Sequence, residues 1–301
     1  MKWWDVADKV TREPAHEVLH KRMVWADEAS VLYLRYEKNT GYVKTSNQQI
    51  DVVRLPGTTY VWVEDKNGNI SSYKTINVPE SALLMTEGNN YTILKGTKLS
   101  DFLSNKGWSI EELNKLIARS VRAGGLHSKV GAATAAISLQ TVLAQKYKIK
   151  LPYESAGIYR NYGADSKWGK YGHNYTTNKD GYYGMDCSAF ITWAYFNTGY
   201  SITNLNPPYW AGWKKTTFSK ENGDIGDILV TLSNNSGSRH VKLIVAKTDT
   251  AFITAEASGT TVGMIVRTHS YSSPGGYAIQ KGELFDSLFQ LVAESKYPTG
   301  F

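Results

Sequence analysis

The chain has 301 residues, of which 42% are hydrophobic and 12% aromatic, enough apolar material for two domains with cores of their own. Its formal net charge of +7 favours an acidic polymer as partner, but the sequence has no block of Lys and Arg and no nucleic-acid-binding motif, so nucleic acid is not expected. It also has no run of 18 apolar residues, so no transmembrane helix is expected, and no signal peptide is visible in the first residues.

The N-terminal part of the chain predicts short β-strands. Residues 31–36, 50–54 and 59–63 alternate in polarity or are rich in β-branched side chains, which is typical of strands. Asn67-Gly68 lies between two strand-like stretches, 61–63 and 70–73, and predicts a hairpin. We therefore expect residues 1–79 to form a small β-sandwich-like module. The turn from Asp65 to Asn69 resembles turns of bacterial immunoglobulin-like modules.

A short motif in the same region suggests a competing site. His16, Glu17 and His20 fit the zinc-protease pattern H-E-x-x-H, in which two histidines one helical turn apart bind the metal and the glutamate acts as base. Pro14 stands just before the motif, and the sequence after it turns into strands without an obvious third ligand nearby. The context therefore disfavours zinc, and we predict no metal site.

The middle of the chain predicts helices. Residues 80–127 form a mixed connector, within which Ser109 and Glu112 make a capping box that opens a helix with one apolar face. That helix ends at Gly124-Gly125. A second helix, from Lys129 to about Lys146, lies at the start of the last predicted domain, residues 128–301.

The only cysteine, Cys187, is the strongest candidate for a reactive group. It cannot form an internal disulfide, it follows Asp186, a good helix N-cap, and it precedes an apolar run with helical spacing. The positive end of a helix dipole favours the thiolate, which is the nucleophilic form. The alternative is a small buried hydrophobe. Residues 157–185, rich in Gly, Tyr and Asn, predict either the wall of a cleft or a disordered loop.

A nucleophilic cysteine needs a base within reach and a third group that orients the base. Of the six histidines, His240 has the best context, because it begins a predicted strand that follows a turn at residues 223–227 and another strand. The alternative is an ordinary half-exposed strand histidine. His269 leads into a Ser/Pro/Gly loop and is expected to be dispensable.

Glu256 is the candidate for the orienting group. Residues 251–257 predict the strand after that of His240, and a three-residue turn would pair Lys247 with Ala251. Glu256 then falls on the same sheet face as His240, where neighbours are about 5–8 Å apart at Cβ. A two-residue turn would put the two side chains on opposite faces, and Glu256 would be a solvated strand carboxylate.

The order of these segments resembles a known family. Asp186-Cys187-Ser188 at a helix start, Gly-Asp before a strand and His-Val in the next strand are similar to NlpC-type peptidoglycan peptidases, which are papain-like cysteine hydrolases. The resemblance spans roughly residues 130–280 and includes the Tyr-containing segment 151–157. It implies that Cys187 is the nucleophile, His240 the general base and Glu256 the orienting residue. It also implies that Tyr153 contacts the oxyanion and that Asp186 and Ser188 contact the substrate peptide.

Three positions depart from the pattern of the family. Ala189 stands where the family usually has Gly, and Lys242 stands where it usually has a small residue. The third catalytic position is most often His, and here it is Glu256. A carboxylate can orient an imidazole, so this last change is chemically acceptable.

We therefore predict an α+β fold with a papain-like C-terminal domain, in which a helix bearing the nucleophile packs on an antiparallel sheet. The expected function is endopeptidase cleavage of peptidoglycan stem peptides without a cofactor. The alternatives are an N-acetylmuramoyl-L-alanine amidase with the same nucleophile, a papain-like acyltransferase and a non-catalytic wall-binding protein. Expected partners are stem peptides and anionic wall polymers. The expected location is the bacterial cell wall or the exterior, reached by secretion or phage delivery.

Overall fold

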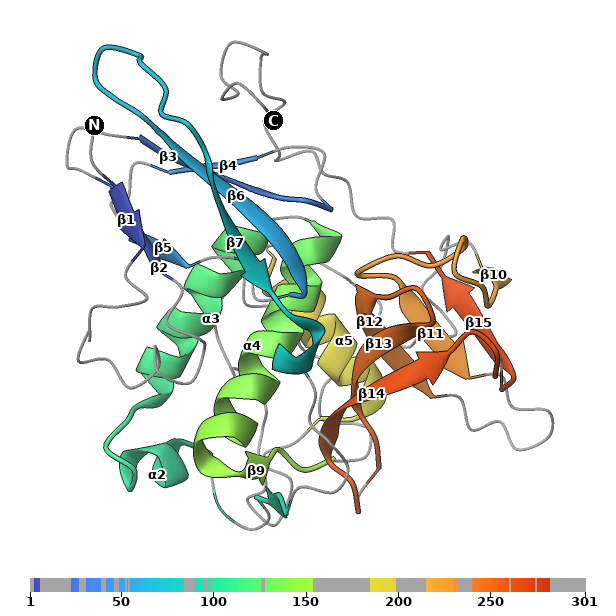
Figure 1. Cartoon of the computed structure of the whole chain (residues 1–301). Helices are drawn as coiled ribbons and strands as arrows, with labels where there is room; N and C mark the ends of the chain where they lie inside the picture. Colours follow the sequence, from blue (N-terminus) through green and yellow to red (C-terminus); the bar gives the residue numbers. More distant parts are fainter. Residues whose placement is uncertain are drawn as a thin grey trace.

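The chain combines helices and antiparallel sheets in a computed structural model (Figure 1). The structure describes residues 3–5, 23–26, 31–38, 42–45, 49–51, 53, 55–83, 90–94, 97, 99–125, 128–153, 185–198, 215–231, 240–259, 261–273 and 275–281. No helix in these ranges is long and apolar enough to cross a membrane. The motif at His16, Glu17 and His20 lies outside the described residues, as does nearly all of the predicted cleft wall at 157–185.

The N-terminal strands form two antiparallel sheets. One has the order β4 (Val43–Thr45), β3 (Val31–Tyr36), β6 (Gly57–Glu64) and β7 (Lys74–Val78). The other has the order β1 (Trp3–Asp5), β2 (Met23–Ala26) and β5 (Gln49–Asp51). Strands predicted at 31–36 and 59–63 are confirmed, whereas the strand predicted at 50–54 is the shorter β5.

The predicted hairpin turn at Asn67-Gly68 is present, but the strand after it begins later than expected. The carboxylate of Asp65 accepts the backbone N–H groups of Asn67 and Asn69, each at 2.9 Å, and Gly68 has a φ of 82°. Ile70 makes only an isolated bridge to Glu64, and β7 starts four residues later. The side chain of Asp65 therefore closes the turn locally, and regular pairing resumes only at Lys74.

In the part of the chain that the structure describes, three longer helices follow a short helix, α2 (Leu99–Ser104). The capping box predicted for α3 (Ile110–Gly124) is confirmed, because the Ser109 hydroxyl accepts the N–H of Glu112 and the Glu112 carboxylate accepts the N–H of Ser109. The second predicted helix is α4 (Lys129–Tyr147), which is apolar and buried along most of its length. The helix that begins at the cysteine is α5 (Cys187–Phe196).

A six-stranded sheet occupies the C-terminal half. Its order is β10 (Lys215–Thr217), β15 (Tyr277–Gln280), β11 (Ile228–Thr231), β12 (Val241–Lys247), β13 (Ala251–Ala257) and β14 (Met264–Ser270), and all of its pairs are antiparallel. A short parallel pair, β8 (Thr92–Ile93) and β9 (Ile149–Lys150), joins the connector to the end of α4.

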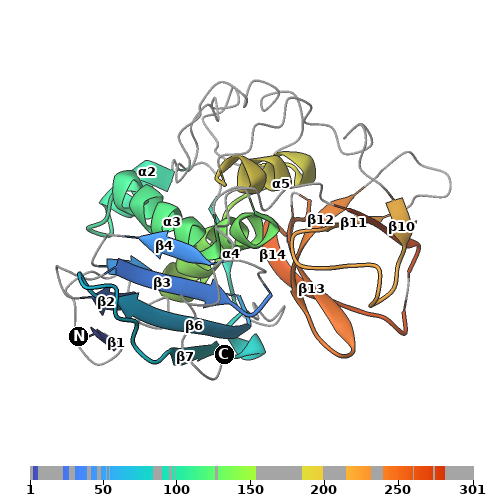
Figure 2. The ribbon, with the colours of Figure 1, turned by 90° about the horizontal axis from the view of Figure 1, so that it is seen from above.

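The helices α3 and α4 lie between the N-terminal strands and the C-terminal sheet (Figures 1 and 2). One hydrophobic core runs through these layers, from Leu32 and Val61 on the N-terminal sheet, through Leu116 of α3 and Leu139 of α4, to Val241 on β12. Because α4 and α5 both pack on β12 and β13, this core fixes the start of α5 relative to the sheet.

The other face of the C-terminal sheet carries a smaller core. Leu229, Ile244, Phe252 and Ile279 form it, with Phe218, Tyr271 and Tyr277 packed against them. Phe218 contacts the rings of Tyr271 and Tyr277, with centroids 6.1 and 5.6 Å away. Tyr271 follows β14 and Tyr277 begins β15, and these two strands are far apart in the strand order. The sheet therefore curls around this aromatic cluster, and its concave face holds the polar residues described next.

Candidate active site

Cys187 is the first residue of α5, as its sequence context predicted, and its side chain is half-buried. The backbone carbonyl of Asp186 accepts the N–H of Phe190, and its carboxylate Oδ1 accepts the hydroxyl of Ser188 at 2.7 Å. Asp186 and Ser188 are half-buried too. All three residues that the family resemblance places at the helix start are therefore partly accessible there.

The short segment that follows β9 brings Tyr153 to the cysteine. Met185 donates its backbone N–H to Pro152 O at 3.3 Å, and Met264 donates to Leu151 O at 3.0 Å. These bonds hold the residues after β9 between α5 and β14. The Tyr153 hydroxyl is within hydrogen-bonding reach of Cys187, and burial, together with Cys187 and Asp186, raises the pKa of Tyr153 to about 12. A protonated hydroxyl thus lies beside the thiol.

A β-bulge in β12 decides whether His240 lies on the same face of the sheet as Glu256. Near the turn, Lys247 pairs with Phe252, so the predicted pairing with Ala251 is wrong by one residue. The register shifts between Ile244 and Ala246, and beyond it Leu243 pairs with Ala255, in the register that the sequence argument required. One extra residue in β12 therefore returns Glu256 to the face of His240.

His240 and Glu256 are in direct contact. His240 Nε2 lies 2.5 Å from Glu256 Oε2, and the carboxylate is fully buried while the imidazole is 27% exposed. Because Glu256 engages Nε2, the ring nitrogen left to face the thiol is Nδ1. A thiol at a helix start, an imidazole and a carboxylate thus lie together, and Cys187 is close enough to His240 to help raise the pKa of the imidazole.

His240 and Glu256 each stabilise the charged form of the other. Burial opposes a charged His240, but hydrogen bonds to Cys187 and Glu256 outweigh it and raise the pKa of His240 to about 9. Burial also opposes ionisation of Glu256, yet the hydrogen bond from His240, the nearby His269 and the charge of Lys242 lower its pKa to about 2. At neutral pH the pair is therefore imidazolium and carboxylate.

Two further residues, which the sequence did not assign to the site, lie behind Glu256. His269, which was expected to be dispensable, lies on β14 with its Nε2 3.8 Å from Glu256 Oε1. Lys242 is only 5% exposed and lies over the ring of Tyr277, with Nζ 4.6 Å from the centroid. The departure from the family pattern at Lys242 therefore places a buried cation on the concave face beside Glu256.

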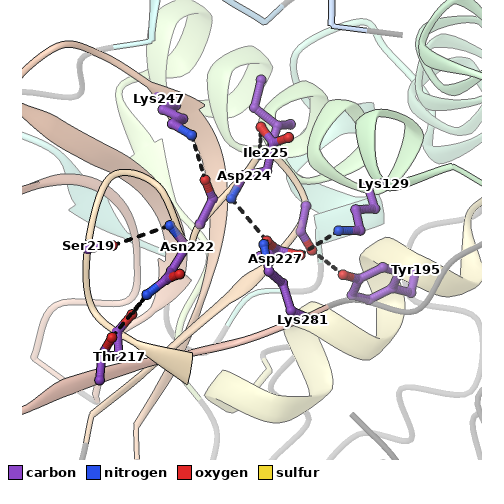
Figure 3. Close-up of polar contacts among 12 residues, drawn as sticks. Lys129, Tyr195, Thr217, Ser219, Asn222, Asp224, Ile225, Asp227, Lys247 and Lys281 are labelled. Atoms are coloured by element: carbon purple, nitrogen blue, oxygen red, sulfur yellow. Dashed lines mark hydrogen bonds and ion pairs between the residues drawn. The ribbon is translucent and has the colours of Figure 1, made fainter. Parts of the chain in front are cut away.

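The Gly-Asp turn before β11 is a structural clamp (Figure 3). Asp227 is fully buried, with Oδ1 2.6 Å from Lys129 Nζ at the start of α4 and Oδ2 3.0 Å from Lys281 Nζ after β15. Gly226 has a φ of 84°, and a Cβ there would lie 2.4 Å from Lys129 Cβ. The Tyr195 hydroxyl of α5 donates to Gly226 O. This turn joins both helices to the sheet.

The same turn is also bonded to β12 beside the bulge. Gly226 donates its N–H to Ile244 O at 2.7 Å, and Ile244 donates to Asp227 O at 2.9 Å. Ile244 is the last residue before the register shift. The Gly-Asp motif thus holds β12 where the bulge sets the position of His240 relative to Glu256.

The site thus combines a thiol at the start of a helix with an imidazole–carboxylate pair on an antiparallel sheet. Residues 142–277, a little under half of the chain, match the model of the NlpC/P60 family. Residues 142–277 are therefore similar to NlpC/P60 proteins, as the motifs of this region indicated. The matched range contains Cys187, His240 and Glu256, and members of this family are generally cell-wall peptidases.

Among solved structures, the chain is similar to a crystal structure of an NlpC/P60 family protein from Bacillus cereus ATCC 10987. The identity is 15% and the TM-score is 0.29, with 87% of this chain and 63% of that chain covered. The chain thus spans less than two thirds of that protein. No curated protein sequence matches the chain.

Proposed function

We propose that the protein is a cell-wall hydrolase that cleaves peptide bonds of peptidoglycan stem peptides through a Cys/His acyl-enzyme mechanism. The observation that carries this proposal is the run of contacts from Cys187 through His240 to Glu256, with 2.5 Å between His240 Nε2 and Glu256 Oε2. The choice of substrate rests on the family match of residues 142–277.

In the first half of the reaction, the Cys187 thiolate attacks the carbonyl carbon of the scissile bond. The backbone N–H of Cys187 and the Tyr153 hydroxyl are the proposed donors to the oxyanion, and one such donor accounts for about 3–4 kcal/mol of transition-state stabilisation in comparable enzymes. His240, charged at neutral pH, then gives its proton to the leaving amine as the C–N bond breaks, which leaves a thioester on Cys187.

In the second half, water replaces the amine. Neutral His240 takes a proton from the water as it attacks the thioester carbonyl, and the collapse of this second intermediate releases a carboxylic acid and restores the thiolate–imidazolium pair. Glu256 stays ionised throughout, because it accepts the hydrogen of Nε2 in both protonation states of the ring. Its proposed role is to fix the ring so that Nδ1 faces the thiol.

The proposed substrate contacts are Asp186 and Ser188, which flank the thiol at the start of α5. The proposed location is the bacterial cell wall or the exterior, where the substrate occurs, and the net charge of +7 is suited to anionic wall polymers. Purified peptidoglycan incubated with the protein should release peptide fragments with new α-amino groups inside the stem. Fragments cut between the sugar and the stem would instead support the amidase alternative.

A further inference from the structure

Among the residues that the structure describes, the second carboxylate oxygen of Glu256 has no close partner. Oε2 is bonded to His240, whereas Oε1 is buried and accepts no hydrogen bond from that part of the chain. A fully buried carboxylate with an open acceptor is costly, because desolvation of the charged oxygen is not compensated. A donor close to Oε1 is therefore expected to matter for Glu256.

The imidazole of His269 faces that oxygen from β14. Its Nε2 is 3.8 Å from Glu256 Oε1 and 3.0 Å from Thr254 Oγ1. The ring of His269 also packs edge-on against Tyr277, with centroids 5.2 Å apart, and the residue is 9% exposed. A shift of a few tenths of an ångström would let one N–H on Nε2 serve both Thr254 and Glu256.

The charged groups that face Glu256 from the described neighbouring segments favour this arrangement. They are His240, just before β12, Lys242 on β12 and Arg267 on β14, whose Nη1 is 3.9 Å from Oε2. Burial and the cations Lys242 and Arg267 lower the pKa of His269, although Glu256 opposes them. His269 is therefore neutral at neutral pH. Because a carboxylate only accepts hydrogen bonds, the tautomer with hydrogen on Nε2 is the one that fits.

We propose that His269 is a positioning residue that acts through Glu256, donating its Nε2 hydrogen to Oε1 and so holding the carboxylate against His240. Its effect on catalysis rests on the proposed function. The assembly then runs from thiol to imidazole to carboxylate to a second, neutral imidazole. Without this donor, Glu256 has a free oxygen in an apolar setting, its carboxylate plane is less restrained, and its hold on the His240 ring weakens.

A matched pair of variants separates the hydrogen bond from the packing. His269→Gln keeps an N–H donor near the position of Nε2, and His269→Met has the same length without a donor. Because Cys187 is the only cysteine, its alkylation by iodoacetamide reports the thiolate–imidazolium pair without any substrate. The rate is measured from pH 4 to 10 in the wild type, both His269 variants, Glu256→Gln and the double variant Glu256→Gln/His269→Met.

We expect His269→Met to lower the alkylation rate at pH 6 about 10-fold, equivalent to about 1.4 kcal/mol, and to move the midpoint about one pH unit upward. His269→Gln should stay within about 3-fold of the wild type. Glu256→Gln should resemble His269→Met, and adding His269→Met to it should have no further effect. Equal effects of Met and Gln, no effect of either, or a further loss in the double variant would each overturn the proposal.

Wall hydrolysis by the same proteins tells the two proposals apart. If the alkylation series follows the prediction but the wild type releases no peptide, the positioning of Glu256 by His269 stands and the proposed function fails. If the wild type hydrolyses walls but His269→Met keeps both its kcat and its alkylation profile, the proposed function stands and the role of His269 is refuted. Unfolding midpoints of both His269 variants provide the control for packing.

Discussion

Glu256 contacts His240, at 2.5 Å between Oε2 and Nε2, only because β12 contains an irregularity between Ile244 and Ala246. If the register at Lys247 and Phe252 continued along the pair, Leu243 would lie opposite Glu256, and His240 would lie on the helix face of the sheet. The bulge shifts the pairing by one residue and puts His240 on the face of the carboxylate. The site thus depends on a backbone irregularity at one point of one strand.

The Glu256 carboxylate should set the pH range of activity. Glu256→Gln removes a negative neighbour that helps to raise the pKa of His240, so that pKa should fall and the thiolate–imidazolium pair should weaken. We expect a loss of about 10-fold in kcat/KM, smaller than for Cys187→Ala or His240→Ala. In the wild type, activity should decline as pH rises through about 9, the pKa of His240. In Glu256→Gln the alkaline limb should move down and the acidic limb up, which turnover measured against pH will test.

The same pair should make stability depend on pH. The pKa of His240 is raised, so its stabilising contribution is complete below about 6.5, declines above that and is lost as pH passes about 9. The pKa of Glu256 is lowered, so its contribution is complete above about 4.5 and is lost as pH falls toward 2. Denaturant unfolding of the wild type and Glu256→Gln should therefore differ most near pH 5–6 and least near pH 10. An equal difference at both pH values would contradict the charged pair.

The Tyr153 hydroxyl should act in the transition state and contribute little to folding. Tyr153→Phe keeps the ring and removes the donor next to Cys187, so we expect kcat to fall about 100-fold with little change in KM. Tyr271→Phe is the matched control, because its hydroxyl donates to Ala251 O at 2.9 Å, at the opposite end of β13 from Glu256. Equal kcat losses in both variants would argue against an oxyanion role for Tyr153.

Asp227 should matter for stability more than for chemistry. Asp227→Asn leaves the ammonium groups of Lys129 and Lys281, about 26% and 33% exposed, without their shared carboxylate. We expect a loss of about 2 kcal/mol of unfolding free energy, below the range for fully buried pairs because both lysines reach solvent. Asp249→Asn, which breaks an exposed pair with Lys220, should leave stability unchanged. Urea unfolding curves of the two variants will show whether Asp227 clamps the helices to the sheet.

Local signals in the sequence were sufficient for much of the fold. The capping box at Ser109, the start of α5 at Cys187 and the strand from Ala251 to Ala257 depend on neighbouring residues, and the structure has all three. The pairing of Lys247 depends on turn geometry and was wrong by one residue, whereas the bulge that restores the register has no local signature in the sequence.

Contacts between charged residues that are far apart in the sequence could not be predicted either, because they too have no local signature. His269 precedes a loop in the sequence, but the curl of the sheet brings it to Glu256. Lys129 and Lys281 are 98 and 54 residues from Asp227, and only the packing of α4 and β15 brings them together. Lys242 was noticed only as a departure from the family pattern. Its burial beside Glu256 has two causes. The sequence predicts the alternation of side chains along β12, but it does not predict that the concave face closes over Lys242.

The central claim is that Cys187 is the nucleophile of a wall peptidase. The direct measurement is mass spectrometry of the fragments released from purified peptidoglycan by the wild type and by Cys187→Ser, with unfolding curves to verify that both are folded. If Cys187 is the nucleophile, the wild type should release fragments with new peptide ends within the stem, and Cys187→Ser should release none at equal stability. Release of the same fragments at an undiminished rate by folded Cys187→Ser would contradict this claim.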